Sequence, residues 1–493
     1  MKNSKISGLA ALPLLFSCSA KDAEHSNVVF IMTDQQSFYM ISAITNSLDP
    51  SHPYANNNYF KTPNLDRLVK SGYTFSNCYA AHPVSGPSRF ALLTGDSPNS
   101  YGMTGNFSPG GKNGERVVST ITTRAMGTLF KNAGYQTYYG GKVHLAWAGG
   151  RGGKGSINDE PTHYGFDNFI TEDDRAILAG KGAEFFSTYD GKDPFLLFLS
   201  FMNPHDICMT QLLFNDRQMD EFEDLDGLEY RSRINQLAWR PKYRNIDPEK
   251  FKTDELAKLP FNMAPTDRFP IRRTRQPFRF DENSWRVHLW FYYRLVEQVD
   301  AEIGQVLDAL EKSRFKDNTI IVFTSDHGEM AGSHGMYGKN VPYEECQKVP
   351  LIFAGKGVKK GTIDNTTPVC NGWDMLPTLL DMAGLEIPKE IKGLSLYKNM
   401  TTGKPINRKY LYYETVNSHG VLENGKYKYT HFVQGEGDNF DGCEALFDLE
   451  KDPGELRNLV YDPSFAAKQK ELRDVLAAEM ESRGMQRLVC KEL

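Results

Sequence analysis

A serine on a glycine–proline turn has the clearest chemical setting in this sequence. Ser85 is followed by Gly86 and Pro87, and the run Ser88–Thr94 predicts a helix directly after the turn. The start of a helix offers free backbone N–H groups and the positive end of the helix dipole to an anion. Arg89, one turn into the helix, would point back toward the same anion. The segment predicts a site for sulfate or phosphate, with an ordinary N-capping turn as the alternative.

Charged or histidine residues follow four apolar runs, each of which predicts a buried strand. The strands are predicted over residues 28–33, 136–139, 195–201 and 319–324, and the residues that follow them are Asp34, Lys142, His205 and Asp326. In an open α/β sheet, ligands bind at the edge where the parallel strands end. Polar residues end strands in many proteins, but an acid, a base and a cation at four such ends favour a functional site. We therefore expect these side chains to lie close together.

The elements that must position these residues follow an alternating pattern of strands and amphipathic helices. This pattern predicts an α/β fold with a large mixed, mostly parallel sheet sandwiched by helices. Helices are predicted over residues 63–71, 121–133 and 289–310, and a further strand over 351–354. After about residue 405 the strands become shorter and more polar. Strands at 410–414, 425–431 and 446–449, with a helix over 465–482, predict a smaller α+β domain with an antiparallel sheet.

The first twenty residues are expected to be a targeting segment. Lys2 and Lys5 precede a short apolar stretch that is too short to span a bilayer as a helix. The run Leu15–Cys18 resembles a bacterial lipobox, in which Cys18 would carry a lipid, and a signal peptide cut after Ala20 is the alternative. We therefore divide the chain into a signal or lipoprotein peptide at 1–20, a catalytic α/β domain at 21–404 and a C-terminal α+β domain at 405–493.

Arginine and aromatic residues are interleaved in the long irregular region between His205 and Trp285. Guanidinium groups match anionic oxygens, and arginine is well suited to such recognition. Aromatic rings can stack on sugar faces, so the region suits an anionic sugar, with a solvated basic surface as the alternative. The residues are Arg231, Arg233, Arg240, Lys242, Arg244, Arg268, Arg272, Arg273, Arg275 and Arg279, with Trp239, Tyr243, Phe269 and Phe278.

Composition and motif spacing argue against several classes of function. The formal net charge is -5, so the chain is not built for bulk attraction to nucleic acid or another polyanion, and an anionic substrate would need a local cluster. The cysteines are scattered without a CxxC pair, which argues against a zinc knuckle or a thioredoxin-like motif; we expect those after Cys18 to be free. The segment Gly150–Gly155 matches GxGxxG by letter only, because no strand precedes it and no helix follows.

The segment that begins at Ser85 resembles the signature of a known enzyme family. Its Ser-x-Pro-Ser-Arg pattern and the following Leu93-Thr94-Gly95 are similar to the signature of the formylglycine-dependent (type I) sulfatases, which have an alkaline-phosphatase-like fold. The resemblance implies that Ser85 is oxidised to formylglycine by a sulfatase-maturating enzyme, the serine form of this chemistry in anaerobic bacteria. The hydrated aldehyde would be the nucleophile.

Two further segments resemble the family's metal ligands. Asp34-Gln35 matches the first ligand pair and Asp326-His327 the second, and the resemblance adds Ser85 in its formylglycine form. Oxygen ligands of this kind suit a hard cation such as Ca²⁺. Many relatives carry Asp at the position of Gln35 and Asn at the position of His327, so the expected site has one negative charge fewer and one softer ligand.

The remaining family motifs supply bases and cations. Lys142 and His144 lie in a Gly-Lys-x-His segment, in which the lysine would hold sulfate oxygens and the histidine would take a proton from the diol. His205, in Pro-His-Asp, would donate a proton to the leaving alcohol. Lys339 matches a later sulfate-binding lysine, and Arg89 would help to stabilise the sulfuryl oxygens. We assign no catalytic role to His334, Glu344 and Glu345.

The resemblance implies hydrolysis of sulfate esters on carbohydrate by an exo-acting enzyme, with amino-sugar sulfates of glycosaminoglycan or mucin favoured. A choline-sulfatase-like or aryl sulfatase, and a phosphonate or phosphodiester hydrolase of the same superfamily, remain alternatives. A glycan-binding surface lipoprotein is the non-enzymatic alternative. The expected location is the periplasm, or the outer membrane through a lipid at Cys18, of a Gram-negative anaerobe. The expected partners are a sulfated saccharide and the maturating enzyme, with no nucleic acid.

Overall fold

The computed structural model describes residues 25–106, 109–145, 161–172, 175, 177–208, 258–264, 266, 282–432 and 444–485. The predicted targeting segment, the region of interleaved arginine and aromatic residues and the 150–155 loop lie outside the described residues. Cys78, Cys208, Cys346 and Cys370 are free thiols, as expected for these four.

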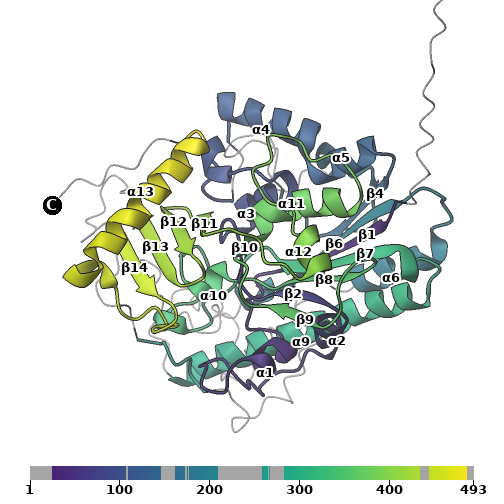
Figure 1. Cartoon of the computed structure of the whole chain (residues 1–493). Coiled ribbons are helices and arrows are strands. Elements are labelled where there is room, and N and C mark those ends of the chain that lie inside the picture. Colours follow the sequence, from purple (N-terminus) through teal and green to yellow (C-terminus); the bar gives the residue numbers. More distant parts are fainter. Residues whose placement is uncertain are drawn as a thin grey trace, which may run out of the picture.

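Eight strands form one large mixed sheet in the order β5-β4-β6-β1-β7-β8-β2-β9 (Figure 1). Its centre is parallel: β1 (Asn27–Asp34) pairs with β6 (Phe195–Pro204) on one side and β7 (Thr319–Ser325) on the other, and β4 (Gln136–Gly141) pairs with β6. The outer strands are β5 (Asn168–Phe169), β8 (Leu351–Gly355), β2 (Gly72–Phe75) and β9 (Thr362–Asp364). This arrangement confirms the predicted fold class, including all five predicted strands.

The central strands are buried on both faces, which explains their near-continuous apolar sequence. In β1, Val29 and Ile31 face one hydrophobic core and Val28, Phe30 and Met32 face the other. The first core is covered by α1 (Ser42–Ser47), α2 (Pro63–Ser71), α6 (Leu178–Thr188) and α9 (Glu282–Lys312). The second is covered by α3 (Ser85–Thr94), α4 (Gly111–Arg124), α5 (Met126–Asn132) and α11 (Asn371–Met382). The helices therefore lie on both faces of the sheet (Figure 1).

Two helix predictions need correction. Residues 121–133 form the end of α4 and all of α5, with extended backbone at Ala125 between them. The Thr128 hydroxyl donates to the Ile121 carbonyl at 3.0 Å, so this helix end is satisfied without a continuous helix. The helix predicted from Ser88 begins at Ser85 instead. Pro87 is compatible with this start, because N–H groups in the first helical turn have no partner within the helix.

The C-terminal part contains an antiparallel sheet in the order β11-β12-β13-β14, with α13 (Ala466–Ser482) packed on it (Figure 1). The strands are β11 (Tyr410–Glu414), β12 (Ser418–Glu423), β13 (Tyr427–Phe432) and β14 (Glu444–Asp448). The predicted α+β texture is confirmed, whereas the domain boundary at residue 405 stays a prediction. Smaller elements are β3 (Cys78–Tyr79), β10 (Val369–Cys370), α10 (Glu344–Gln347), α12 (Tyr397–Thr402) and the 3-10 helices Pro98–Tyr101, Pro161–Tyr164, Lys316–Asn318, Ser333–Gly335, Leu459–Tyr461 and Pro463–Phe465.

Candidate active site and metal centre

The two aspartates come together because their strands are neighbours in register. Thr33 of β1 pairs with Ser325 of β7, so Asp34 and Asp326 emerge side by side at the carboxyl edge of the sheet. The backbone N–H of Gln35 donates to Asp326 Oδ1 at 3.0 Å, which ties the two strand ends together. This is the edge that the sequence predicts for ligand binding.

Ser85 lies at the first turn of α3, against both strand ends. Its Oγ is 3.2 Å from Asp34 Oδ2 and 3.1 Å from His327 Nε2, and it accepts from Lys339 Nζ at 3.4 Å. Gly328, which follows His327, is required here because a Cβ at this position would lie 1.9 Å from the Glu345 carbonyl oxygen. The hydroxyl therefore sits between an acid, an imidazole and an ammonium group.

Arg89 holds both aspartates in place. Its Nη2 donates to Asp34 Oδ2 at 2.9 Å and its Nε to Asp326 Oδ2 at 3.2 Å, and the side chain is 1 % exposed. Its Nη1 donates to Ser200 Oγ at 2.7 Å and to the Lys142 carbonyl at 3.1 Å. These contacts direct the guanidinium toward the carboxylates. They differ from the expectation that Arg89 points at a bound anion.

Asp34, Asp326 and His327 could hold a divalent metal ion. One ligand atom from each lies within 4.8 Å of the others, and all three residues are buried. Asp34 Oδ1 is buried and accepts no hydrogen bond. His327 Nδ1 lies 2.9 Å from the Gly328 carbonyl, which only accepts, so Nδ1 carries the proton and Nε2 is left with its lone pair.

The electrostatics of the aspartate pair also fit a cation. Burial and the neighbouring Asp34 raise the pKa of Asp326 to about 7. Burial alone would raise the pKa of Asp34 too, but Lys142, together with His205, Lys339 and Arg89, holds it well below its ordinary value. A divalent ion between the two carboxylates would relieve the repulsion that raises the pKa of Asp326.

Two lysines flank the serine. Lys142 Nζ lies 2.5 Å from Asp34 Oδ2, and burial lowers the pKa of Lys142. Lys339 Nζ lies 3.9 Å from Asp34 Oδ1 in addition to its contact with Ser85. Gly141 ends β4 directly before Lys142. Only glycine fits this position, because its φ is +87° and a Cβ there would lie 2.2 Å from the Ser200 carbonyl oxygen. The site thus presents two ammonium groups to an anion.

The two predicted proton-transfer histidines belong to the same cluster. His205 Nε2 lies 4.0 Å from Asp34 Oδ1, and burial and Lys142 lower the pKa of His205 well below its ordinary value. Burial, Lys142 and Arg89 lower the pKa of His144 to about 3, which keeps this imidazole neutral and able to accept a proton. All the predicted site residues therefore lie in one neighbourhood at the carboxyl edge of the sheet.

Three residues at the site have no role in the sequence analysis. Ser200 accepts a hydrogen bond from Arg89, and the sequence feature that could have identified it is a hydroxyl within a mostly apolar strand. Cys208 Sγ lies 3.2 Å from Gln35 Nε2, and nothing in its sequence context marks it. Glu329 accepts from the Gln35 side chain, and its signal is its place two residues after His327.

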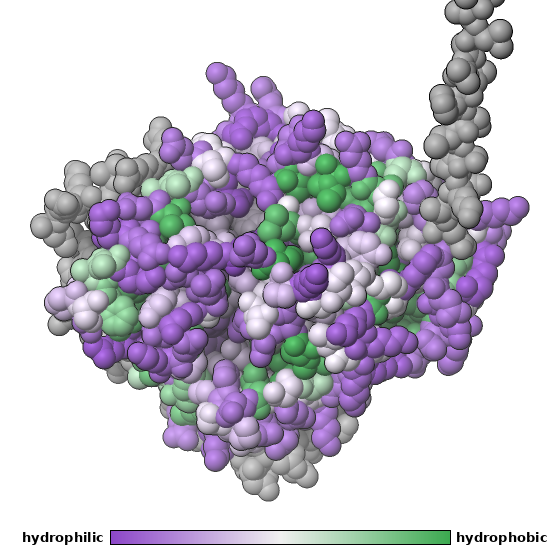
Figure 2. Space-filling view, viewed as in Figure 1, coloured by the Kyte–Doolittle hydropathy of each residue, from purple (hydrophilic) through white to green (hydrophobic). Residues whose placement is uncertain are grey.

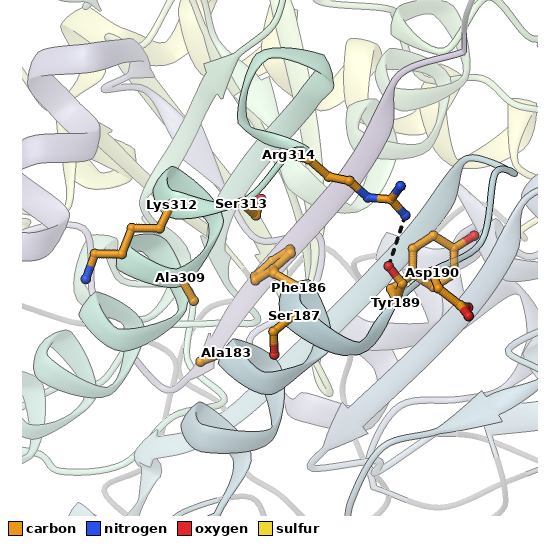
Figure 3. Close-up of a pocket in the computed structure, with 9 residues that line it drawn as sticks. All are labelled: Ala183, Phe186, Ser187, Tyr189, Asp190, Ala309, Lys312, Ser313 and Arg314. Atoms are coloured by element: carbon orange, nitrogen blue, oxygen red, sulfur yellow. Dashed lines mark hydrogen bonds between the residues drawn. The ribbon is translucent and has the colours of Figure 1, made fainter.

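A separate surface groove lies at the other edge of the sheet. It is lined by residues of two helices, α6 and α9, and of the segments that directly follow them on the way to β6 and β7 (Figure 3). These residues are Ala183, Phe186, Ser187, Tyr189, Asp190, Ala309, Lys312, Ser313 and Arg314. Arg314 crosses the groove to donate to the Tyr189 carbonyl at 3.1 Å. In Figure 2, apolar residues are scattered in small patches among polar ones. Within the described ranges, no helix is both long and apolar enough to cross a membrane.

Fold and site together fit a hydrolase of anionic esters, with a hydroxyl, a buried Asp/Asp/His group that could hold a metal ion and two lysines at the edge of a doubly wound sheet. The chain belongs to the sulfatase family, whose model matches residues 26–385. A second model, described as N-sulphoglucosamine sulphohydrolase, C-terminal, matches residues 332–482. The protein is therefore a sulfuric ester hydrolase, as the sequence predicts. This family generally uses formylglycine and a divalent metal.

The chain is similar to several bacterial sulfatases over most of its length. It is 30 % identical to the N-acetylglucosamine-6-O-sulfatase of Bacteroides thetaiotaomicron, over 95 % of this chain and 89 % of that protein. It is also 30 % identical to the Delta 4,5-hexuronate-2-O-sulfatase of the same organism, over 84 % and 82 % of the two chains. A solved structure in complex with its substrate D-glucosamine-2-N,6-O-disulfate matches with a TM-score of 0.67 and 25 % identity, over 94 % of this chain and 98 % of that one.

Proposed function

We propose that this protein is an exo-acting carbohydrate sulfatase that removes O-sulfate from amino sugars or uronic acids of glycosaminoglycan or mucin. The observation that carries the proposal is the convergence on Ser85 Oγ of Asp34, His327 and Lys339 from separate segments of the chain. The similarity to the two Bacteroides enzymes supports a sugar substrate. Those enzymes are named for the 6-O and the 2-O position, so the position in this protein is left to experiment.

The proposed cofactors are Ca²⁺ and a formylglycine made from Ser85. Asp34, Gln35, Asp326, His327 and the modified Ser85 would hold the ion, which when bound supplies positive charge beside the sulfuryl oxygens. The formylglycine supplies the hydroxyl that attacks sulfur. The unpartnered Asp34 Oδ1 and the raised pKa of Asp326 support a cation at this place.

The protein's own side chains would carry the remaining steps. Lys142 and Lys339 bind the sulfate oxygens, on which charge builds during transfer. His205 donates a proton to the leaving sugar oxygen, and the neutral His144 accepts a proton from the diol. Because burial and Lys142 lower the pKa of His205, the bound sulfate must offset the charge of the lysines for this imidazole to be protonated. Placed proton transfer of this kind contributes about 10²–10⁴ to the rate. Arg89 keeps the two aspartates in register for the ion, because its donors already bind them.

Targeting and maturation complete the proposal. The segment 1–20 would direct export, to the periplasm or, through a lipid on Cys18, to the outer membrane of a Gram-negative anaerobe. A sulfatase-maturating enzyme would act on Ser85. Ser85 is fully buried, so this oxidation would have to precede folding.

The test is a panel of position-defined sulfated mono- and disaccharides, with choline sulfate, 4-nitrophenyl sulfate and a phenyl phosphonate. The enzyme is co-expressed with a maturating enzyme, and mass spectrometry measures the loss of two hydrogens at Ser85. We expect turnover of a sulfated amino sugar or uronic acid. Turnover of choline sulfate or the phosphonate alone would reject the carbohydrate assignment, and full activity with an unmodified Ser85 would reject the nucleophile.

A further inference from the structure

Glu329 is a buried carboxylate that touches two parts of the site. Its Oε1 accepts from the backbone N–H of Gly338 at 2.5 Å and of Ala331 at 3.2 Å, and its Oε2 accepts from Gln35 Nε2. The side chain is 1 % exposed. Because Gly338 precedes Lys339, one carboxylate holds both the Gln35 side chain and the backbone that carries a sulfate-binding lysine.

The Gln35 amide has only one orientation that satisfies its neighbours. On one side Gln35 Nε2 donates to Glu329, and on the other Gln35 Oε1 accepts from Lys339 Nζ at 2.9 Å. A carboxylate only accepts and an ammonium only donates, so turning the amide over would lose both hydrogen bonds. The Cys208 thiol, within 3.2 Å of Nε2 and 3.3 Å of Oε1, does not decide the orientation because it can donate or accept.

The oxygen of the amide is thereby held against Lys339, which lies beside the reacting groups. The Lys339 ammonium that binds Gln35 Oε1 also contacts Ser85 Oγ at 3.4 Å and lies 3.9 Å from the unpartnered Asp34 Oδ1. A reversed amide would present an NH₂ group, which cannot bind a cation. A carboxylate at position 35 would present an oxygen in either orientation, whereas an amide does so in only one.

We propose that Glu329 is a positioning residue that fixes the polarity of the Gln35 amide, so that its oxygen and not its nitrogen faces the metal ion. The identity of the ion as Ca²⁺ rests on the proposed function above. The Gln35–Glu329 pair therefore acts as a unit in which one member must be the acceptor and the other the donor.

The variant E329Q removes the acceptor at almost constant shape. Its new amide must keep an oxygen toward the N–H groups of Gly338 and Ala331, which leaves its NH₂ group facing Gln35. Gln35 then turns over and directs Nε2 toward the cation. We expect the affinity of the full-length matured protein for Ca²⁺, measured by isothermal titration calorimetry, to fall about 10–100-fold, the usual effect of losing an outer-shell partner.

The double variant Q35E/E329Q restores the pair with its roles exchanged. The new amide at position 329 donates to the new carboxylate at position 35, which still offers an oxygen to Lys339 and the cation. We expect Ca²⁺ affinity at least equal to that of the unaltered protein. This recovery separates control of polarity from a general structural role, because a structural role would lose more from two substitutions than from one.

The matched control is D300N. Asp300 is also 1 % exposed and also accepts a backbone N–H, from Leu65 at 2.8 Å, but it lies on α9 and caps α2. This variant is expected to lose stability and keep its Ca²⁺ affinity. Unchanged affinity in E329Q, or a double variant that binds as weakly as E329Q, would overturn the proposal. If E329Q does not fold, the double variant is compared with the unaltered protein, and a Ca²⁺ affinity at least ten-fold weaker would overturn the proposal. The readout is ion binding, so it stands apart from any failure of the sugar-sulfatase assignment.

Discussion

Two buried ionic clusters in this protein have similar charges but differ in how closely cations approach their carboxylate oxygens. Beside the C-terminal sheet, Lys428 of β13 lies 2.9 Å from both Glu344 of α10 and Glu455. Tyr79 donates to Glu344 at 2.8 Å, and the Glu344 N–H donates to Glu455 at 2.8 Å. At the site, two aspartates also meet buried cations, yet Lys339 Nζ and His205 Nε2 come no closer to Asp34 Oδ1 than 3.9 Å and 4.0 Å, whereas Lys428 lies 2.9 Å from Glu455 Oε1. A closed cluster joins parts of the fold, whereas an open one keeps an atom for a ligand.

Replacement of the nucleophile should give the largest loss of activity and leave the cluster at Lys428 unchanged. S85A removes the hydroxyl from which the reactive group is made, while Ser85 contributes nothing to the cluster at Lys428. We expect turnover of the preferred sugar sulfate to fall by more than about 10⁴-fold, as for other nucleophile deletions. Steady-state kinetics with the matured protein measure this, and circular dichroism confirms the fold. Activity within ten-fold of the unaltered protein would contradict the assignment.

Removal of the lysine from the cluster at Lys428 should lower stability and leave ion binding unchanged. K428M leaves the carboxylates of Glu344 and Glu455 buried without their lysine, and breaking such a pair costs about 3–5 kcal/mol. Urea unfolding should show that loss of stability, while Ca²⁺ affinity of the folded protein stays unchanged. A K428M protein of unchanged stability would show that this cluster is not needed to hold α10 against the C-terminal sheet.

Removal of the proposed acid should depend on the leaving group. H205N takes away the proton donor, which contributes about 10²–10⁴ for a sugar alcohol. An activated aryl sulfate leaves without a proton, so its rate should change little. The ratio of kcat for 4-nitrophenyl sulfate to that for the sugar sulfate should therefore rise. Equal losses on both substrates would assign His205 to binding instead.

The open cluster should bind its ion in a pH-dependent way. Because the metal-free pKa of Asp326 is raised to about 7, Ca²⁺ must displace a proton below that pH. Affinity should fall by up to about ten-fold per pH unit below 7 and level off above it. Calorimetry in buffers of different ionisation enthalpy measures the released proton. An affinity that is flat between pH 5.5 and 8 would show that Asp326 is already ionised.

The sequence predicted the central strands, and that Asp34, Lys142, His205 and Asp326 would lie close together at their ends, because both depend on local patterns. Runs such as Phe195–Phe201 are short and, apart from Ser200, apolar on both faces, which is typical of a buried parallel strand. The sequence did not predict α11, whose Pro377 argues against a helix and is tolerated by the surrounding packing. It also gave no role to Glu329, because the meaning of that residue depends on a side chain almost three hundred positions away.

The pairing of Thr33 with Ser325 has a consequence for how this chain can vary. Side chains alternate between the faces of a strand, so inserting or deleting one residue within β1 or β7 would turn Asp34 or Asp326 away from its partner. Length changes should therefore be lethal to activity in these two strands. The peripheral strand β9, which carries none of the site residues, should accept them far more readily.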